Sequence, residues 1–522
     1  MKVFNKWRLL FLVFTAVYGV LLSLSLGYMA IQWDEVPHLY GGLLLAHGQS
    51  QAYISTYGYY PPLYDILTAG YFQIFGASVT SGRLLAVTFS LLSTWIVFEF
   101  ASRTYGPKTG LISSILLGSM PGFFWLSRVA MLETMLVFFF SLALFFFFSW
   151  MHFDKNKTLI FCGLALGMGF LAKYQILIAA LVMVVALLLL SWKKLRKRAP
   201  KFLLIAVIAI LVVIPWFLVL SQNGLGRLGE ILYVIQEGGQ DRAIYSTRFP
   251  APIFYLIELT WPFPDIPVHP VSILVYILGL LGLGLWAYRR KTEDKFFLTW
   301  FIVIYVFFSL IPNKQWRYAV PLFPVLAISA ASLIIFVYSK AAEALKRGQV
   351  SLNKKRLVKV AAGVFVVFAV TAVVYSGYES YQMVERDQIN LPLQEATAYA
   401  ADHINQNESI MVLCAVNRFN LDMVKFYLQA DEFKQNPVFQ YPEMPVDAFT
   451  PTFEVNELIS MCEEHNVKYV LLYEYGATFP FFNSTLTVHE VFFDLLASGR
   501  FVYNPDTLFG SSPRTISIFT FT

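Results

Sequence analysis

The sequence predicts a polytopic α-helical membrane protein with about eleven transmembrane helices, followed by a C-terminal α/β domain outside the membrane. Two observations predict the membrane part: 57% of the 522 residues are hydrophobic, and only 14% are charged. Soluble domains carry roughly 25% charged residues. A third observation predicts the separate domain, because residues 378–522 lack the long apolar runs that precede them. The net charge of +6 does not indicate nucleic-acid binding, since the basic residues lie at membrane boundaries.

Apolar runs recur throughout residues 1–377, and about 20 such residues suffice to cross a bilayer. The run 158–192 is too long for one crossing, and both of its flanks are basic, so we divide it at Lys173-Tyr174-Gln175. The predicted spans are 9–30, 79–101, 109–126, 131–150, 158–172, 176–192, 202–221, 271–288, 296–311, 317–338 and 358–377.

The basic residues predict the orientation of these spans, because cytoplasmic loops are rich in Lys and Arg. Alternate loops carry the basic residues, and the loops between them hold only scattered ones. The N-terminus is therefore expected in the cytoplasm and residues 378–522 outside it, in a multi-pass protein of the cell membrane. The cytoplasmic clusters are Lys2, Lys6 and Arg8; Arg103 and Lys108; Lys155 and Lys157; 193–201; Arg289–Lys295; and Lys340–Lys359.

Two of the predicted outer loops are long. In loop 31–78, apolar residues at helical spacing from Val36 to Leu44 predict an amphipathic helix in the membrane interface, and a second helical piece follows at Leu63–Phe75. Loop 222–270 contains Gly238-Gly239 and the run Trp261–Pro264. Long loops often act as lids over functional sites, and a plain connector is the open alternative.

The final 145 residues, 378–522, read as alternating helices and apolar strands, the pattern of a small α/β domain. Two glycosylation sequons, at Asn407 and Asn483, are compatible with an extracytoplasmic location. The predicted elements are helices at Leu393–Ile404, Leu421–Leu428 and Val455–Glu464, and strands at Ile410–Cys414 and Val467–Tyr473.

The candidate site begins where the first span ends, at Trp33-Asp34-Glu35. Neighbouring residues on a helix face different ways, so only one of the two carboxylates can point into a given site. Other ionisable residues also lie at the predicted outer ends of spans, and charges at such places are often functional. These residues are Arg83, Arg128, Glu133, Lys173, Lys314 and Arg317. Pro312 should end the span before the last two, and Lys314 and Arg317, three residues apart, would share a face if the turn from Asn313 is already helical. Each residue alone could equally well be an interface anchor. Because all of them lie on the predicted outer face of the membrane, they predict one polar site covered by loops.

Four short motifs, in order along residues 1–340, resemble those of the GT-C membrane glycosyltransferases. The nearest branch looks like the protein O-mannosyltransferases and the lipid A aminoarabinose transferase. The family usually places Lys or His before the Pro-Pro pair, where this chain has Tyr60. The motifs are Trp33-Asp34-Glu35, Tyr60–Tyr64, Ser127–Glu133 and Asn313–Tyr318, followed by Pro321 and Pro324.

The resemblance implies inverting transfer of a sugar from a polyprenyl-phosphate carrier to an acceptor on the outer face, as in a mannosyltransferase. It assigns the general base to Asp34. Glu35 and Glu133 would orient the acceptor or hold a divalent cation, whose requirement is left open, and no other cofactor is expected. Positive charge is needed at the leaving phosphate. Its candidate ligands are Arg128, Lys314, Arg317, Tyr60, Arg83 and Lys173.

Two other classes of protein remain as alternatives. One is a transporter or flippase of a lipid-linked sugar, although a transporter should carry ionisable residues near the membrane midplane and broken helices in repeated halves. The sequence shows neither pattern. The other is a non-catalytic membrane sensor whose outer domain binds a ligand. The identity of the sugar and of the acceptor does not follow from the sequence.

Overall fold

The computed structural model describes residues 6–222, 248–261, 269–346, 352–387, 391–413, 419–430, 434–442, 453–474, 487–512 and 514–522. Most of the predicted loop 222–270, including Gly238-Gly239 and Pro262–Pro264, lies outside these residues, as does the sequon at Asn483. The chain forms two compact units, which we describe separately. The first is Met1–Leu24, Ile54–Tyr64 and Arg83–Arg386, and the second is Ser25–Tyr53, Asp65–Gly82 and Asp387–Thr522. The domain boundary predicted at 377/378 stays a prediction.

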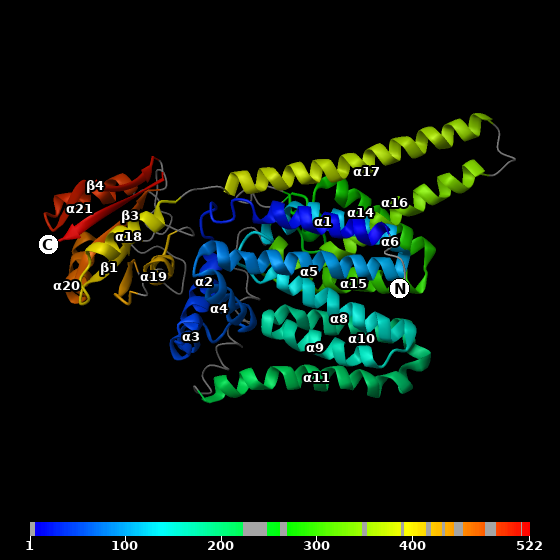
Figure 1. The fold of residues 1–522 in the computed structure, drawn as a ribbon, viewed down its shortest axis with the longest axis horizontal. Helices are drawn as coiled ribbons and strands as arrows, with labels where there is room; N and C mark the ends of the chain where they lie inside the picture. Colours follow the sequence, from blue (N-terminus) through cyan, green and yellow to red (C-terminus); the bar gives the residue numbers. More distant parts are fainter. Residues whose placement is uncertain are drawn as a thin grey trace. The chain divides into compact units, whose positions relative to one another are not determined.

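The first unit is a bundle of apolar helices (Figure 1). Its helices are α1 (Lys6–Ser23), α5 (Val79–Tyr105), α6 (Pro107–Ser119), α7 (Pro121–Leu126), α8 (Glu133–Phe153), α9 (Lys157–Ala172), α10 (Leu177–Ser191), α11 (Leu195–Gln222), α13 (Phe254–Glu258), α14 (Ile273–Arg289), α15 (Thr292–Leu310), α16 (Phe323–Lys346) and α17 (Leu352–Asp387). Four 3₁₀ turns are described in the chain: η1 (Trp33–Glu35), η2 (Tyr174–Ile176), η3 (Trp192–Lys194) and η5 (Trp316–Leu322).

Small residues let neighbouring helices of the bundle approach closely, as is common between membrane helices. Helix α9 packs against both α8 and α11. A Cβ atom added at Gly167 of α9 would lie 2.7 Å from Val212 Cβ of α11, which is closer than real Cβ contacts. Helices α14 and α16 meet in the same way, because a Cβ at Gly282 would lie 2.2 Å from the carbonyl oxygen of Ser329. These glycines hold the bundle at short interhelical distances.

Each of the eleven predicted spans coincides with one or two helices of the structure. Among the described residues, six helical stretches are long and apolar enough to cross a bilayer by length and composition, and α9 and α14 are shorter apolar helices. The chain is thus a polytopic, integral membrane protein, while the number of crossings stays a prediction. The six stretches are Lys6–Ser23, Val79–Tyr105, Glu133–Phe153, Tyr174–Gln222, Trp316–Lys346 and Asn353–Glu385.

The first span differs from its predicted extent. The apolar run was expected to be helical as far as Ala30, but α1 ends at Ser23. Ser25 then adopts a positive φ of 51°, a left-handed conformation that a regular helix cannot contain. Hydropathy alone therefore overestimated the helix by seven residues, because residues 24–30 remain apolar after the chain has turned.

The second unit combines two pieces of the N-terminal region with the C-terminal part of the chain. The N-terminal pieces carry α2 (Val36–Ala46), the start of α3 (Ser50–Tyr57) and most of α4 (Leu63–Phe75). The predicted helical pieces in this region are therefore confirmed. However, the apolar side of α2, which was expected to face the membrane interface, is buried within the protein. Its buried residues are Val36, Leu39, Tyr40, Leu43 and Leu44.

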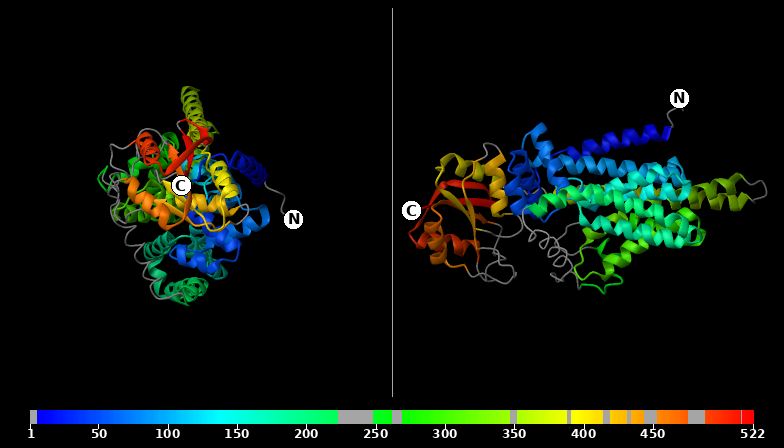
Figure 2. Two further views of the ribbon diagram at one scale, coloured as in Figure 1. Left: turned by 90° about the vertical axis from the view of Figure 1, so that its left-hand side faces the viewer. Right: turned by 90° about the horizontal axis from the view of Figure 1, so that it is seen from below.

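The C-terminal part contains a five-stranded sheet in the order β2-β1-β3-β5-β4. Strand β1 pairs in parallel with β2 and β3, whereas β5 is antiparallel to both β3 and β4. Figure 2 shows helices packed around these strands. The elements are α18 (Leu393–His403), β1 (Ser409–Leu413), α19 (Leu421–Ala430), β2 (Val438–Tyr441), α20 (Val455–Glu464), β3 (Val467–Glu474), α21 (Val488–Ala497), β4 (Phe501–Ser511) and β5 (Arg514–Phe521).

Strand β3 lies at the centre of the sheet and is its most continuously apolar strand in sequence. Its run Val470–Tyr473 is buried on both faces, as expected of a strand covered by helices. The five elements predicted from the sequence are all present with closely similar bounds, and Cys414 lies outside the described residues. Strands β2, β4 and β5 and helix α21 were not predicted.

Candidate functional site

Asp34 and Glu35 differ sharply in their surroundings, although they are neighbours in the 3₁₀ turn η1. Glu35 is fully buried, and its Oε2 accepts a hydrogen bond of 2.8 Å from the backbone N–H of Gln32. This is the reciprocal half of a capping box, which fixes the turn. Asp34 is exposed. Of the two carboxylates, Asp34 is therefore the one accessible to a reacting group, as the alternation of neighbouring side chains predicts.

Glu133 and Lys173, both predicted site residues, form an ion pair in the first unit. Glu133 is the first residue of α8, and Lys173 directly follows α9, so the antiparallel packing of the two helices brings them together. Lys173 Nζ donates to Glu133 Oε1 at 2.7 Å. The side chain of Glu133 is 2% exposed and that of Lys173 is 19% exposed. The pair is thus largely shielded from solvent, and only its lysine side is partly exposed.

The unequal burial of this pair predicts unequal effects of substitution. Lys173→Met leaves the Glu133 carboxylate buried without its cation, and we expect a loss of about 3 kcal/mol of unfolding free energy. Glu133→Gln should cost less, because Lys173 can turn toward water. Unfolding in mixed detergent micelles measures both changes. The control is Lys340→Met, since Lys340 and Glu343 pair at 2.8 Å but are both exposed, and such pairs contribute at most about 1 kcal/mol. Equal losses at Lys173 and Lys340 would contradict this interpretation.

Arg83 and Arg128 form a second charged group in the same unit. Arg83 lies near the start of α5 and is fully buried. The Arg128 guanidinium donates to the carbonyl oxygens of Leu21, Leu22 and Leu24, at 3.2, 2.7 and 2.7 Å. It thereby satisfies the C-terminal end of α1, a common role for arginine. Burial, together with the charge of Arg83, lowers the pKa of Arg128 to about 10. Its predicted contact with phosphate stays a prediction.

Lys314 and Arg317 lie in the turn between α15 and α16. Pro312 was expected to end the preceding span, and α15 does end at Leu310. Lys314 is buried, and its Nζ lies 3.3 Å from the carbonyl oxygen of Pro312. Arg317 donates from Nε to Gln315 Oε1 at 2.7 Å, and its guanidinium lies 6.0 Å from the centre of the Tyr318 ring.

One expectation about this turn is wrong. Lys314 and Arg317 were expected to share a helical face if the turn from Asn313 were already helical. The 3₁₀ turn η5 begins only at Trp316, and Gln315 is extended, with φ −140° and ψ 143°. The three-residue spacing therefore does not align the two cations. An extended residue between them sets their directions instead.

Tyr60, the residue before the Pro-Pro pair, lies in a segment that contacts the turn after α9. The rings of Tyr59 and Tyr60 are 4.5 Å apart. The Tyr174 hydroxyl donates to the carbonyl oxygen of Tyr59 at 3.1 Å. Because Tyr174 is the neighbour of Lys173, this contact brings the Tyr60 segment to the Glu133–Lys173 pair. Where the family usually has Lys or His, this chain thus presents a neutral aromatic side chain.

Sequence reasoning missed several polar residues beside these groups. Glu258 is 3% exposed, in the short helix α13, which packs on η5. Tyr255 of the same helix contacts the backbone of Gln315. Asn313 is also buried, and its side-chain nitrogen lies 3.5 Å from the Tyr318 hydroxyl. The only signal for Glu258 was a single acid within an apolar, aromatic stretch.

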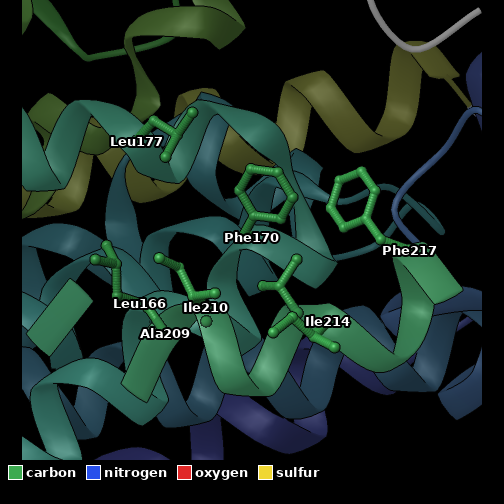
Figure 3. A pocket seen from close by; sticks show the side chains of 9 residues that line it. Leu166, Phe170, Leu177, Ala209, Ile210, Ile214 and Phe217 are labelled. Atoms are coloured by element: carbon green, nitrogen blue, oxygen red, sulfur yellow. The ribbon is translucent and has the colours of Figure 1, made fainter. Parts of the chain in front are cut away.

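The first unit also contains an apolar groove of about 290 Å³ between α9, α10 and α11. The labelled side chains in Figure 3 come from these three helices, with Phe170 and Phe217 at one end. Their ring centres are 6.2 Å apart, and Phe170 precedes Lys173 by less than one helical turn. The lining residues include Leu166, Gly167, Leu177, Ala209, Ile210 and Ile214.

No group of three or more His, Cys, Asp or Glu side chains within the described part of the chain is arranged to hold a metal ion. The two acids considered for this role have other contacts: Glu35 closes the turn at Gln32, and Glu133 pairs with Lys173. Whether either binds a cation stays a prediction.

The fold and these groups together define a class: an integral, multi-pass membrane protein with charged residues at helix ends and an exposed carboxylate in the turn η1. A family model described as dolichyl-phosphate-mannose-protein mannosyltransferase matches residues 60–218.

Curated relatives carry a related description. An undecaprenyl phosphate-alpha-4-amino-4-deoxy-L-arabinose arabinosyl transferase of Proteus mirabilis is 23% identical over 391 residues, which cover 72% of this chain and 66% of the relative. One of Pectobacterium atrosepticum is 24% identical over 50% of this chain and 46% of its own. The matched part thus spans about half to two-thirds of these relatives' length.

Solved structures agree in fold. ArnT from Cupriavidus metallidurans, bound to undecaprenyl phosphate, matches with a TM-score of 0.66 at 16% identity, over 98% of both chains. The oligosaccharyltransferase of Archaeoglobus fulgidus matches with a TM-score of 0.56 at 16% identity, over 90% of this chain and 69% of that one. The family model, the relatives and the shared fold together confirm the resemblance to GT-C membrane glycosyltransferases that the four motifs indicate.

Proposed function

We propose that this protein transfers a sugar from a polyprenyl-phosphate donor to an acceptor at the outer face of the membrane, with inversion at the sugar. The main observation in support is the gathering of buried or half-buried cations at the helix ends of an otherwise apolar bundle. Among them, Arg83, Arg128 and Lys314 are buried, and the side chain of Lys173 is 19% exposed. Positive charge at this place suits a lipid phosphate, because it stabilises the charge that develops as the phosphate leaves.

The proposed reaction balances without a cofactor. An acceptor hydroxyl or amine attacks the anomeric carbon of the sugar, and its proton passes to Asp34. The bond between that carbon and the phosphate oxygen breaks, and its electron pair stays on the polyprenyl phosphate. General-base assistance of this kind contributes about 100- to 10,000-fold. Arg317, Lys314 and Lys173 would hold the phosphate, and the apolar groove between α9 and α11 would accept part of the lipid chain.

Turnover by purified protein in lipid nanodiscs tests the proposal. Two donors are offered in parallel: undecaprenyl-phosphate 4-amino-4-deoxy-L-arabinose, named for the relatives, and polyprenyl-phosphate mannose, suggested by the family model. Release of lipid phosphate that depends on an added acceptor, with a sugar-bearing product seen by mass spectrometry, is the expected result. Movement of intact donor across the membrane without bond cleavage would instead favour a flippase.

The proposal also requires that residues 378–522 lie outside the cytoplasm. In a cysteine-free background, Asn456→Cys should react with a membrane-impermeant maleimide added to intact cells, because Asn456 is exposed on α20. Asn353→Cys, exposed at the start of α17, should react only after the cells are opened. The reverse labelling pattern would invert the topology and place Asp34 on the wrong side for an extracytoplasmic reaction.

A further inference from the structure

A buried hydrogen-bond network in the second unit lies just beyond the candidate base. His38 Nδ1 of α2 is 2.8 Å from Asp65 Oδ1 of α4, and the Tyr53 hydroxyl of α3 donates to Asp65 Oδ2 at 2.8 Å. His38 is 4% exposed, Asp65 0% and Tyr53 1%. Sequence analysis assigned no role to any of these three residues.

Two glycines of α2 allow this helix to pack closely against α3 and α4. A Cβ atom at Gly41 would lie 3.1 Å from Tyr53 Cε2 and 3.3 Å from Asp65 Oδ2. At Gly42 it would lie 2.5 Å from Thr68 Cγ2. Any side chain at these positions of α2 would push the helix away from α3 and α4. Two adjacent glycines therefore keep His38 within hydrogen-bond distance of Asp65.

Packing alone does not account for the network. Burying a carboxylate is costly, and well-packed apolar residues in place of a buried ionic group are often as stable or more so. Burial raises the pKa of Asp65, while the facing charge of His38 and the two hydrogen bonds oppose that rise. A fully connected network of this kind fixes one geometry of its members. The group whose geometry is fixed here is the imidazole of His38.

Asp34 lies one helical turn before that imidazole. The intervening residues Glu35 and Val36 have right-handed helical dihedral angles, at φ −80°, ψ −31° and φ −59°, ψ −46°. Residues four apart on such a backbone share a face, and side chains lean toward the N-terminus. His38 and Asp34 are therefore expected on the same face of this turn, while Asp65 holds the His38 ring through Nδ1.

Helix α19 of the C-terminal part also packs against α2. Gln429 hydrogen-bonds to Tyr40, and the ring centres of Phe426 and Phe72 are 6.2 Å apart. Contacts with α3, α4 and α19 therefore restrict movement of α2. The titratable side chains described around α2 include Asp34, Glu35, Tyr53, Asp65 and, on α19, Asp422 with its partner Lys425.

We propose that His38 is a positioning residue for Asp34. Asp65 and Tyr53 hold the imidazole through Nδ1, and its Nε2 edge orients the Asp34 carboxylate and favours the ionised form. The consequence for catalysis rests on the proposed function, but the effect on Asp34 exists in the resting protein. A carboxylate with a cationic or hydrogen-bonding partner keeps its proton only at lower pH.

Carbodiimide modification tests this effect without turnover, because the reagent attacks protonated carboxylic acids and the modified peptide is counted by mass spectrometry. His38→Asn keeps an amide at the Nδ1 position but removes the Nε2 edge. We expect it to move the pH midpoint for modification of Asp34 upward by about one unit. His38→Gln, which keeps a polar group near the Nε2 position, should shift the midpoint less. The exposed Asp506 of β4 serves as an internal control for the reagent, and its pH midpoint for modification should be the same in all variants.

A second pair of variants keeps the test decisive if His38→Asn does not fold. Tyr53→Phe removes one hydrogen bond to Asp65 and should shift the Asp34 midpoint in the same direction. Its matched control is Tyr441→Phe, since Tyr441 donates to Glu457 Oε2 at 2.9 Å in the sheet of the same unit. That variant loses a comparable bond and should leave Asp34 unchanged.

The possible outcomes separate this inference from the proposed function. A shifted Asp34 midpoint together with a kcat that falls more than KM rises supports both. A shifted midpoint in the variants, when the wild-type protein turns over no donor, keeps the positioning role and rejects the function. Unchanged midpoints in both His38→Asn and Tyr53→Phe, with wild-type turnover intact, overturn the positioning role alone.

Discussion

Asp34→Asn should lower transfer turnover by about 100- to 10,000-fold while the affinity for the donor is largely kept. The substitution preserves size and hydrogen bonding but removes the group that accepts the proton. The structure sharpens this expectation, because Asp34 is exposed whereas Glu35 is buried and bonded to Gln32. Steady-state rates of lipid-phosphate release measure turnover, and equilibrium binding of the donor in nanodiscs measures affinity.

Glu35→Gln is the matched control for this substitution. Its amide oxygen can still accept the hydrogen bond from the Gln32 N–H, so the turn η1 should persist and turnover should fall far less. A loss equal to that of Asp34→Asn, in a protein of unchanged thermal stability, would mean that the two carboxylates act together. Unchanged turnover with weakened donor binding in Asp34→Asn would reassign Asp34 to binding.

Arg317→Ala should lower turnover by about 100- to 1,000-fold if its guanidinium stabilises the leaving phosphate. Arg317→Lys should lose less but remain clearly impaired, because lysine is a point charge and lacks the planar fork that suits phosphate. The contacts of Arg317 to Gln315 and Tyr318 hold the side chain in the turn before α16. Rates at saturating donor and acceptor separate this effect from weaker binding.

The alternative for Arg317 is an interface anchor that contacts bulk lipid headgroups. Arg248→Lys provides the comparison, since Arg248 is another arginine of a predicted outer loop and donates to the carbonyl oxygen of Trp261 at 3.3 Å. An anchor would respond as Arg248 does, with turnover close to wild type after exchange for lysine. Wild-type turnover in Arg317→Ala, with the protein inserted and folded, would remove this residue from the site.

The spacing of apolar residues along the chain predicted helices correctly where the apolar run and the helix end at the same residues. Leu63–Phe75 was predicted as a helical piece and is α4 with the same bounds. The pattern failed at Ser25, because a left-handed residue inside an apolar run leaves no signal in hydropathy. Strands β4 and β5 were missed for another reason. Strand β4 is an edge strand of mixed exposure that pairs with β5, and β5 pairs with β3, which ends about 40 residues before β5 begins.

The sequence predicted which charged residues belong to the candidate site, but not which of them contact one another. Spacing along the chain gave Lys314 and Arg317 a shared face, and the extended Gln315 removes it. No pattern links Glu133 to Lys173, since their contact arises from the packing of α8 against α9. The same holds for His38 and Asp65, which are 27 residues apart and meet only because Gly41 and Gly42 admit close helix packing.

The composition of the second unit has a consequence for biosynthesis. Its early pieces end at Gly82 and its late piece begins at Asp387, so about 300 residues separate them along the chain. Helix α19 begins about 375 residues after α2 ends, so at a synthesis rate of about 5–20 residues per second α2 waits roughly 20–75 s for α19 to emerge. During that interval Tyr40 lacks its partner Gln429, and α2 lacks the cover that α19 provides. The nascent chain therefore needs a chaperone, or the translocation machinery itself, to shield this helix, and a transcript truncated before α19 should yield a product that is degraded.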